Sequence, residues 1–88
     1  MRPRVSWMNQ TDDRILSLLE ESGLMLSPAV IAANLDYTRG WVSKRLRKLL
    51  EAGLVEKSQS SYYEITERGE KYLVGEIEAG ILEDTIKD

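Results

Sequence analysis

The chain has 88 residues, the size of one small domain, carries a net charge of −3, and contains neither cysteine nor histidine. The missing residue types exclude disulfides, thiolate metal sites, a cysteine nucleophile and the commonest general base, so we expect no enzyme activity, metal or cofactor. No apolar run approaches the roughly 20 residues of a membrane span, and the start MRPRVSWMN lacks the apolar segment of a signal peptide, so we expect a cytoplasmic protein without membrane contact.

The first 22 residues divide into an arm and a helix. Residues 1–10 are predicted to form a short arm in which Arg2 and Arg4 either contact phosphates or are disordered. Thr11 is predicted to cap the first helix, because a threonine oxygen accepts from the free N–H groups of a first turn. Gly23 is predicted to end it. Its buried stripe consists of Ile15, Leu18 and Leu19.

A second helix is predicted directly after a short apolar link, 24–26, which is a candidate strand. Ser27 is its expected cap, and Pro28 fits the first helical position because the N–H there has no partner in any case. Asp36 and Tyr37 are predicted to form a turn. The residues expected to face the core are Ile31, Ala32 and Leu35.

The third helix is predicted from Thr38, its expected cap, to Glu51. At 100° per residue it separates into an apolar stripe and an opposite polar face. Ser43 lies on one flank of the polar face, with Trp41 and Lys48 on the other flank. The stripe consists of Val42, Leu46, Leu49 and Leu50, and the opposite face consists of Gly40, Lys44, Arg47 and Glu51.

This third helix concentrates positive charge in an acidic protein. Five basic residues lie between positions 38 and 48, with no acidic residue among them: Arg39, Lys44, Arg45, Arg47 and Lys48. A cationic helix mounted on a second helix across a tight turn is what insertion into a DNA major groove requires. The alternative is a basic helix face that is merely solvated.

A hairpin and a last helix complete the chain. Strands are predicted at 54–58 and 62–65, joined by the polar turn 59–61. Thr66 is expected to cap a helix whose apolar stripe runs from Tyr72 to Ile86. We therefore divide the chain into the arm 1–10, a DNA-binding domain 11–75 and a C-terminal segment 76–88. The last helix either completes the core of the monomer or pairs with a second copy.

Two segments of the sequence resemble a known protein family. They are SPAVIAANLDYTRGWVSKRLRKLLEAGLVEK and YYEITERGEKYL. Both resemble winged helix-turn-helix domains, which are mostly α with a small β-hairpin wing. With the opening WMNQTDDRIL, the chain is similar to archaeal regulators of the haloarchaeal phage-repressor type. The resemblance implies a sequence-specific regulator of transcription that binds double-stranded DNA, repression being the commoner outcome, and usually acts as a homodimer.

The resemblance also implies roles for particular residues. The residues expected to face bases are Thr38, Arg39, Gly40, Ser43, Lys44 and Arg47. Contacts to phosphates are expected from Ser27, Arg45, Lys48, Gln59 and Ser60. The residues expected to form the dimer contact are Leu73, Ile77, Ile81 and Leu82. The wing turn is short and lacks arginine, which argues against minor-groove reading by the wing.

Several alternatives remain open on the sequence. Arg45 fits an ion pair with Glu20 or Glu21 almost as well as a phosphate contact. Trp41 either stacks on the DNA backbone or packs against the second helix. Gly40 either lets the helix approach DNA closely or only relaxes the first turn. The whole domain has a second possible class, a protein-interaction module that does not bind DNA. No effector site is recognisable.

Overall fold

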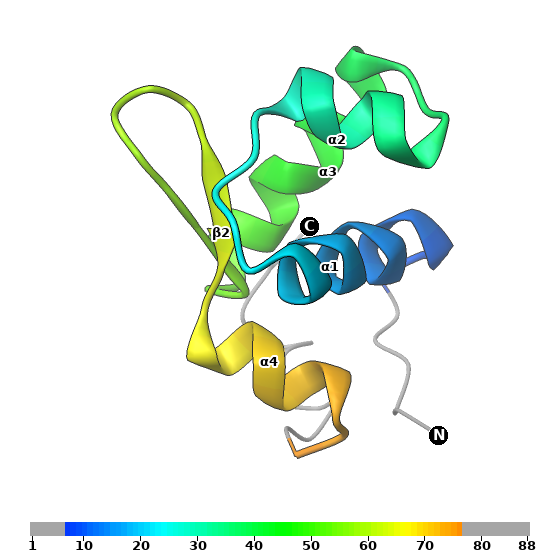
Figure 1. Cartoon of the computed structure of the whole chain (residues 1–88). Coiled ribbons are helices and arrows are strands. Elements are labelled where there is room, and N and C mark those ends of the chain that lie inside the picture. The colour runs from blue at the N-terminus through cyan, green and yellow to red at the C-terminus, as the bar shows by residue number, and fades with distance from the viewer. Residues whose placement is uncertain (1–6, 77–88) are drawn as a thin grey trace.

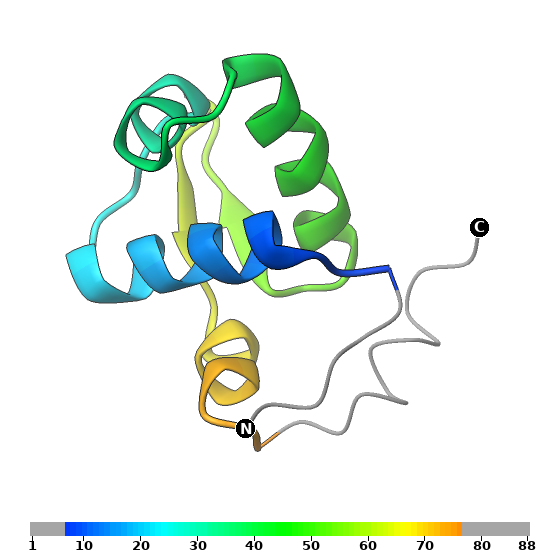
Figure 2. The ribbon, with the colours of Figure 1, turned by 90° about the vertical axis from the view of Figure 1, so that its right-hand side faces the viewer.

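The computed structural model of the chain describes residues 7–76. The elements follow the predicted order: α1 (Gln10–Ser22), α2 (Pro28–Leu35), α3 (Arg39–Glu51), β1 (Val55–Lys57), β2 (Tyr63–Ile65) and α4 (Glu67–Leu73). The predicted mostly α architecture with a small hairpin is confirmed. The tip of the hairpin lies on the same side of the domain as α2, and α4 lies at the opposite end (Figures 1 and 2). In the described part of the chain, no helix is long and apolar enough to cross a membrane.

Three predicted helix caps are confirmed, and the fourth is wrong. Ser27, Thr38 and Thr66 each accept a backbone N–H of the helix that follows. The cap of α1 is Asn9, two residues before the predicted Thr11. Asn9 and Asp12 form a reciprocal pair in which each side chain accepts the backbone N–H of the other. This pair satisfies two free donors together, whereas a lone threonine would satisfy one.

The hydrophobic core forms where α1, α3 and the hairpin meet. Its fully buried members include Ile15, Leu19, Val42 and Leu46. Met8 is also buried and Trp7 packs against the core, so the folded domain begins before residue 11. Leu50, predicted to complete the stripe of α3, is 37% exposed, whereas Leu49 in the same turn is fully buried. At 100° per residue Leu50 lies at the edge of the stripe, so its side chain is only partly covered.

The hairpin is antiparallel, with Val55 opposite Ile65 and Lys57 opposite Tyr63. Of the candidate strand 24–26, only an isolated bridge at Leu26 forms, in which Leu26 and Tyr63 exchange two backbone hydrogen bonds of 2.8 Å. This bridge attaches the segment just before α2 to the first residue of β2, at the end of the hairpin ladder that adjoins the turn. The wing is therefore anchored beside the helix-turn-helix, which fixes where its tip lies.

The last helix is shorter than predicted. It ends at Leu73, and Gly75 adopts φ +79°, the left-handed conformation that favours glycine. Within α4, Gly69 is buried against the backbone of Leu54 and the side chain of Ile65. The predicted stripe beyond this point, including Ile77, Ile81 and Leu82, lies outside the described residues.

Candidate nucleic-acid interface

The two central helices form a helix-turn-helix. Asp36 ends α2 in the left-handed conformation, φ +62°, and two residues later Thr38 begins the next helix with its Oγ1 3.1 Å from the Trp41 nitrogen. Ile31 and Ala32 are the buried residues of α2. Both were expected to face the core from the sequence, and both belong to the hydrophobic core. The turn thereby presents α3 along one side of the domain.

The outward face of α3 is cationic, as its periodicity predicts. Arg39, Gly40, Lys44 and Arg47 are exposed, and Ser43 is half-buried. No acidic residue lies between Asp36 and Glu51. The structure thus brings together on one surface the predicted base-facing side chains of α3, which we call the outward face: Arg39, Gly40, Ser43, Lys44 and Arg47.

Gly40 lies in open space on this face. A Cβ atom built there would meet no other atom of the described chain within 4 Å. The packing of the domain therefore does not require a glycine at this position. The reading in which Gly40 allows close approach of an external molecule stays a prediction.

A hollow beside the outward face is lined by two of the predicted phosphate contacts, Ser27 and Ser60, and by Arg39, a predicted base contact. It has a volume of ≈ 320 Å³ and lies between the start of α2, the start of α3 and the wing. Gln59 is exposed at the wing tip, and Lys48 is half-buried in the last turn of α3. Hydroxyl groups and one guanidinium in a surface hollow suit a phosphate oxygen.

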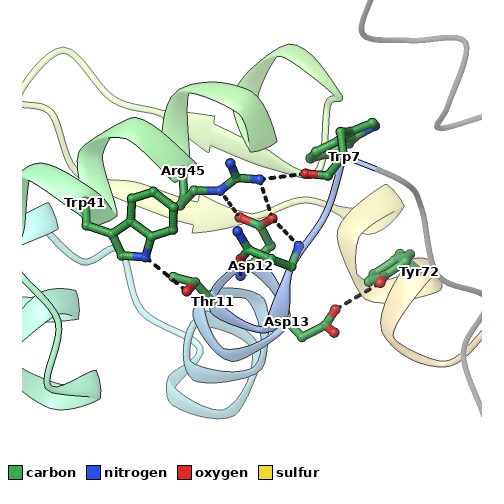
Figure 3. A network of polar contacts seen from close by, with 8 residues as sticks. Trp7, Thr11, Asp12, Asp13, Trp41, Arg45 and Tyr72 are labelled. Atoms are coloured by element: carbon green, nitrogen blue, oxygen red, sulfur yellow. Dashed lines mark hydrogen bonds and ion pairs between the residues drawn. The ribbon is translucent and has the colours of Figure 1, made fainter.

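Arg45 does not belong to this surface. Arg45 is only 6% exposed, and its guanidinium donates to the Asp12 carboxylate through Nε (2.9 Å) and Nη2 (2.6 Å). Nη2 also donates to the carbonyl oxygen of Trp7, at 2.8 Å (Figure 3). The expected phosphate contact is therefore corrected to an internal ion pair, and the partner is Asp12 rather than Glu20 or Glu21. Hydrogen bonding to Asp12 raises the pKa of Arg45 despite its burial, so the group stays charged.

Trp41 is half-buried and contacts the first turn of α1. Its indole Nε1–H donates to the hydroxyl oxygen of Thr11 at 3.0 Å (Figure 3). The guanidinium carbon of Arg45 lies 5.5 Å from the ring centroid, a cation–π distance. These contacts hold the indole nitrogen against α1, and stacking of the ring on the DNA backbone stays a prediction.

Residue spacing alone does not reveal the α1 residues in this network. Thr11 is predicted only as a helix cap and no partner is predicted for Asp12, yet both are buried and hydrogen-bond to α3. The spacing Asn9-x-x-Asp12 does carry a capping-box signal, although the partnership with Arg45 depends on how two distant helices cross. A second link joins the same helix to the turn, where Arg14 donates to the Tyr37 oxygen at 3.0 Å.

The predicted dimer residues are only partly described. Leu73 is half-buried and packs against the hydrophobic core of its own chain. Its side chain therefore has a role in the monomer. Ile77, Ile81 and Leu82 lie beyond the described residues, so their pairing stays a prediction.

The helix-turn-helix, the hairpin beside it and the exposed cationic helix define a winged-helix DNA-binding protein. Residues 1–85 match the family described as winged helix-turn-helix phage repressor, and the chain belongs to that family. It is 40% identical over 87 residues to the repressor protein of Halobacterium phage phiH, covering 94% of this chain and 98% of that protein. The predicted family resemblance is confirmed.

A solved structure supports the fold independently. The chain is similar to the PhiH1 repressor-like protein from Haloarcula marismortui, whose crystal structure it matches with a TM-score of 0.82. The match has 38% sequence identity and covers 90% of this chain and 91% of that one. These relatives point to a regulatory DNA-binding protein, and none of them favours the interaction module that does not bind DNA.

Proposed function

We propose that this chain represses transcription by placing the first three turns of α3 in the major groove of an operator. The observation that carries the proposal is the exposed cationic face of α3 in a protein of net charge −3. The acidic remainder disfavours approach to DNA by any other face, because like charges repel. Occupying a promoter blocks polymerase, which requires only this one domain. We place this activity in the archaeal cytoplasm, where an operator is accessible.

The proposed contacts divide between bases and phosphates. Arginine and lysine can donate to the O6 and N7 acceptors of guanine, and serine and threonine can reach bases or phosphates. The proposed base contacts are Thr38, Arg39, Gly40, Ser43, Lys44 and Arg47. The proposed phosphate contacts are Ser27, Lys48, Gln59 and Ser60, while Arg45 is withdrawn from this set because it is buried.

We further propose that the chain binds as a homodimer through its C-terminal segment. A single winged helix offers few base contacts, and two half-sites multiply specificity. Apolar residues continue at helical spacing after Leu73, which is consistent with a pairing surface. They are Ile77, Ile81 and Leu82, with Ile86 beyond them. A dimer of this kind would present two copies of α3 to a palindromic site.

The test compares two lysine variants that change net charge equally. Lys44→Ala removes a cation from the outward face, and Lys71→Ala removes one from α4, where Lys71 is exposed and pairs with Glu67 at 3.3 Å. In fluorescence anisotropy with a duplex selected by the wild-type chain, Lys44→Ala is expected to lose about 1–3 kcal/mol of binding free energy. Lys71→Ala is expected to bind within about twofold of wild type, because exposed pairs of this kind contribute little.

Each outcome of that comparison is informative. Equal losses in the two variants would mean that net charge, and not the outward face, governs binding, and would contradict the proposed site. Failure of the wild-type chain to select any duplex would contradict the proposed function as a whole. The stoichiometry at saturation tests the dimer, for which two chains per duplex are expected and one chain would refute it.

A further inference from the structure

Side chains in the first turn of α1 contact α3 at residues outside its outward face. Thr11 is only 7% exposed, and its hydroxyl accepts the Nε1–H of Trp41. Arg14, on the same helix, donates to the hydroxyl oxygen of Tyr37, in the turn that leads into α3, at 3.0 Å. The N-terminal half of α1 is therefore linked both to the turn and to the first turn of α3.

The next residue holds the same helix one turn further along. Asp12 is fully buried and binds Arg45 with both carboxylate oxygens. Trp41 and Arg45 are four residues apart, so they lie on one side of α3. Figure 3 shows both side chains directed from α3 toward the first turn of α1. These contacts attach α3 to α1 on a side of α3 that differs from the outward face.

Directional contacts of this kind restrict the rotation of α3 about its axis, which apolar packing alone leaves free. Val42, Leu46 and Leu49 bury α3 against the core, but the hydrophobic effect is non-directional and tolerates small rotations of a helix. A hydrogen bond weakens steeply as its angle departs from linearity. A binding site needs its groups held within about 0.5 Å and 10–20°. Two directional contacts at successive turns therefore restrain the rotation of α3 about its axis.

We propose that Thr11, with Trp41 and Arg45, is a positioning residue for operator recognition: it sets the rotation of α3 without touching DNA. The inference rests on the proposed function, since it concerns the accuracy with which the outward face meets bases. It makes a distinctive prediction. Loss of the Thr11 hydroxyl reduces binding to the operator, where alignment matters, and leaves binding to random duplex unchanged, where phosphate contacts are made in any register.

The test uses Thr11→Val, which keeps the shape of the side chain and removes the hydroxyl, with Thr11→Ser as the matched control that keeps it. The probes are a duplex selected in vitro by the wild-type chain and a random duplex of equal length. Thr11→Val is expected to bind the selected duplex about 3- to 10-fold more weakly, the scale of one lost hydrogen bond. Thr11→Ser is expected to bind as wild type does, and both variants should bind the random duplex normally.

Trp41→Phe then separates positioning from direct contact. Its loss of affinity should match that of Thr11→Val, and the double variant should be no weaker than the weaker single variant, because both remove the same contact. The slope of affinity against salt should stay at the wild-type value, since no phosphate contact is removed. Wild-type affinity in Thr11→Val, or losses that multiply in the double variant, would overturn the proposal.

Two further comparisons distinguish failure of the positioning role from failure of the proposed function. If Lys44→Ala loses operator binding while Thr11→Val does not, the positioning role fails and the proposed function stands. If neither variant loses binding, the proposed function fails. If the Thr11 hydroxyl only stabilises the fold, Thr11→Val is partly unfolded and loses affinity for the selected and the random duplex equally. That result would also overturn the positioning role.

Discussion

Replacing Asp12 by alanine is expected to destabilise the domain by about 3–5 kcal/mol, the usual result of removing one partner of a buried ion pair. The carboxylate is fully buried and satisfies two donors of Arg45, whose guanidinium would otherwise be left charged in the interior. The substitution also removes the oxygen that accepts the Asn9 N–H at 2.9 Å, and with it half of the capping box. Urea unfolding followed by circular dichroism measures the loss.

A second variant shows whether the buried charge is the cause. In Asp12→Ala/Arg45→Met, no uncompensated charge remains and the methionine fills part of the space of the arginine stem. We expect the double variant to regain a large part of the stability lost in Asp12→Ala. If the single variant unfolded at the wild-type urea concentration, or if the double variant were no more stable than the single, the ion pair would not have the role assigned to it.

Gly69→Ala is expected to destabilise the domain by about 1–3 kcal/mol or more, as overpacking of a well-packed core does. An alanine Cβ at this position would overlap the carbonyl oxygen of Leu54 and the side chain of Ile65. The oxygen belongs to the backbone just before β1 and accepts the Thr66 N–H at 3.1 Å, so it has little freedom to move. Intrinsic helix propensity acts in the opposite direction, by about 1 kcal/mol in favour of alanine.

Gly40→Ala is the matched control, because Gly40 is also helical but its Cβ would enter open space. Only the propensity difference remains there, so this variant should be as stable as wild type or more stable by up to about 1 kcal/mol. Thermal unfolding of the two variants side by side gives the comparison. Equal stability of Gly69→Ala and Gly40→Ala would mean that α4 can shift away from the hairpin without cost.

Local signals explain why most of the fold could be predicted. Ser27, Thr38 and Thr66 each precede an apolar-periodic segment, and a cap depends only on residues within one turn. The turn at Asp36 and the hairpin tip are likewise encoded over a few residues. The outward face of α3 follows from helical periodicity alone, which is why the exposure of Lys44 and Arg47 agrees with the prediction.

Long-range contacts explain the errors. The sequence predicts that Arg45 meets a phosphate, Glu20 or Glu21, whereas the packing of α3 on α1 brings it to Asp12, 33 positions earlier. The hydrogen bond from the Trp41 indole to Thr11, 30 positions earlier, is likewise beyond what residue spacing predicts. Nothing in the spacing of residues along one helix reveals which residue of another helix lies opposite.

Two competing local signals account for the remaining differences. Asn9 and Thr11 are both good cap residues, and the reciprocal bonds between Asn9 and Asp12 decide in favour of Asn9. The apolar stripe predicts one helix from Thr66 toward Ile86, but α4 ends at Leu73 and Gly75 follows it in the left-handed conformation. The individual DNA contacts stay predictions, because they depend on a partner that sequence periodicity does not describe.

The most direct test of the account is to map the DNA-binding surface by NMR. The full chain, labelled with ¹⁵N, is titrated with a duplex selected by the wild-type protein, and amide chemical shifts are followed residue by residue. We expect the largest changes at residues 38–48, at the start of α2 and at the wing tip around Ser60, with small changes along α4. Changes concentrated on α4 and the adjoining part of α1, with α3 unaffected, would contradict the proposed DNA-binding surface.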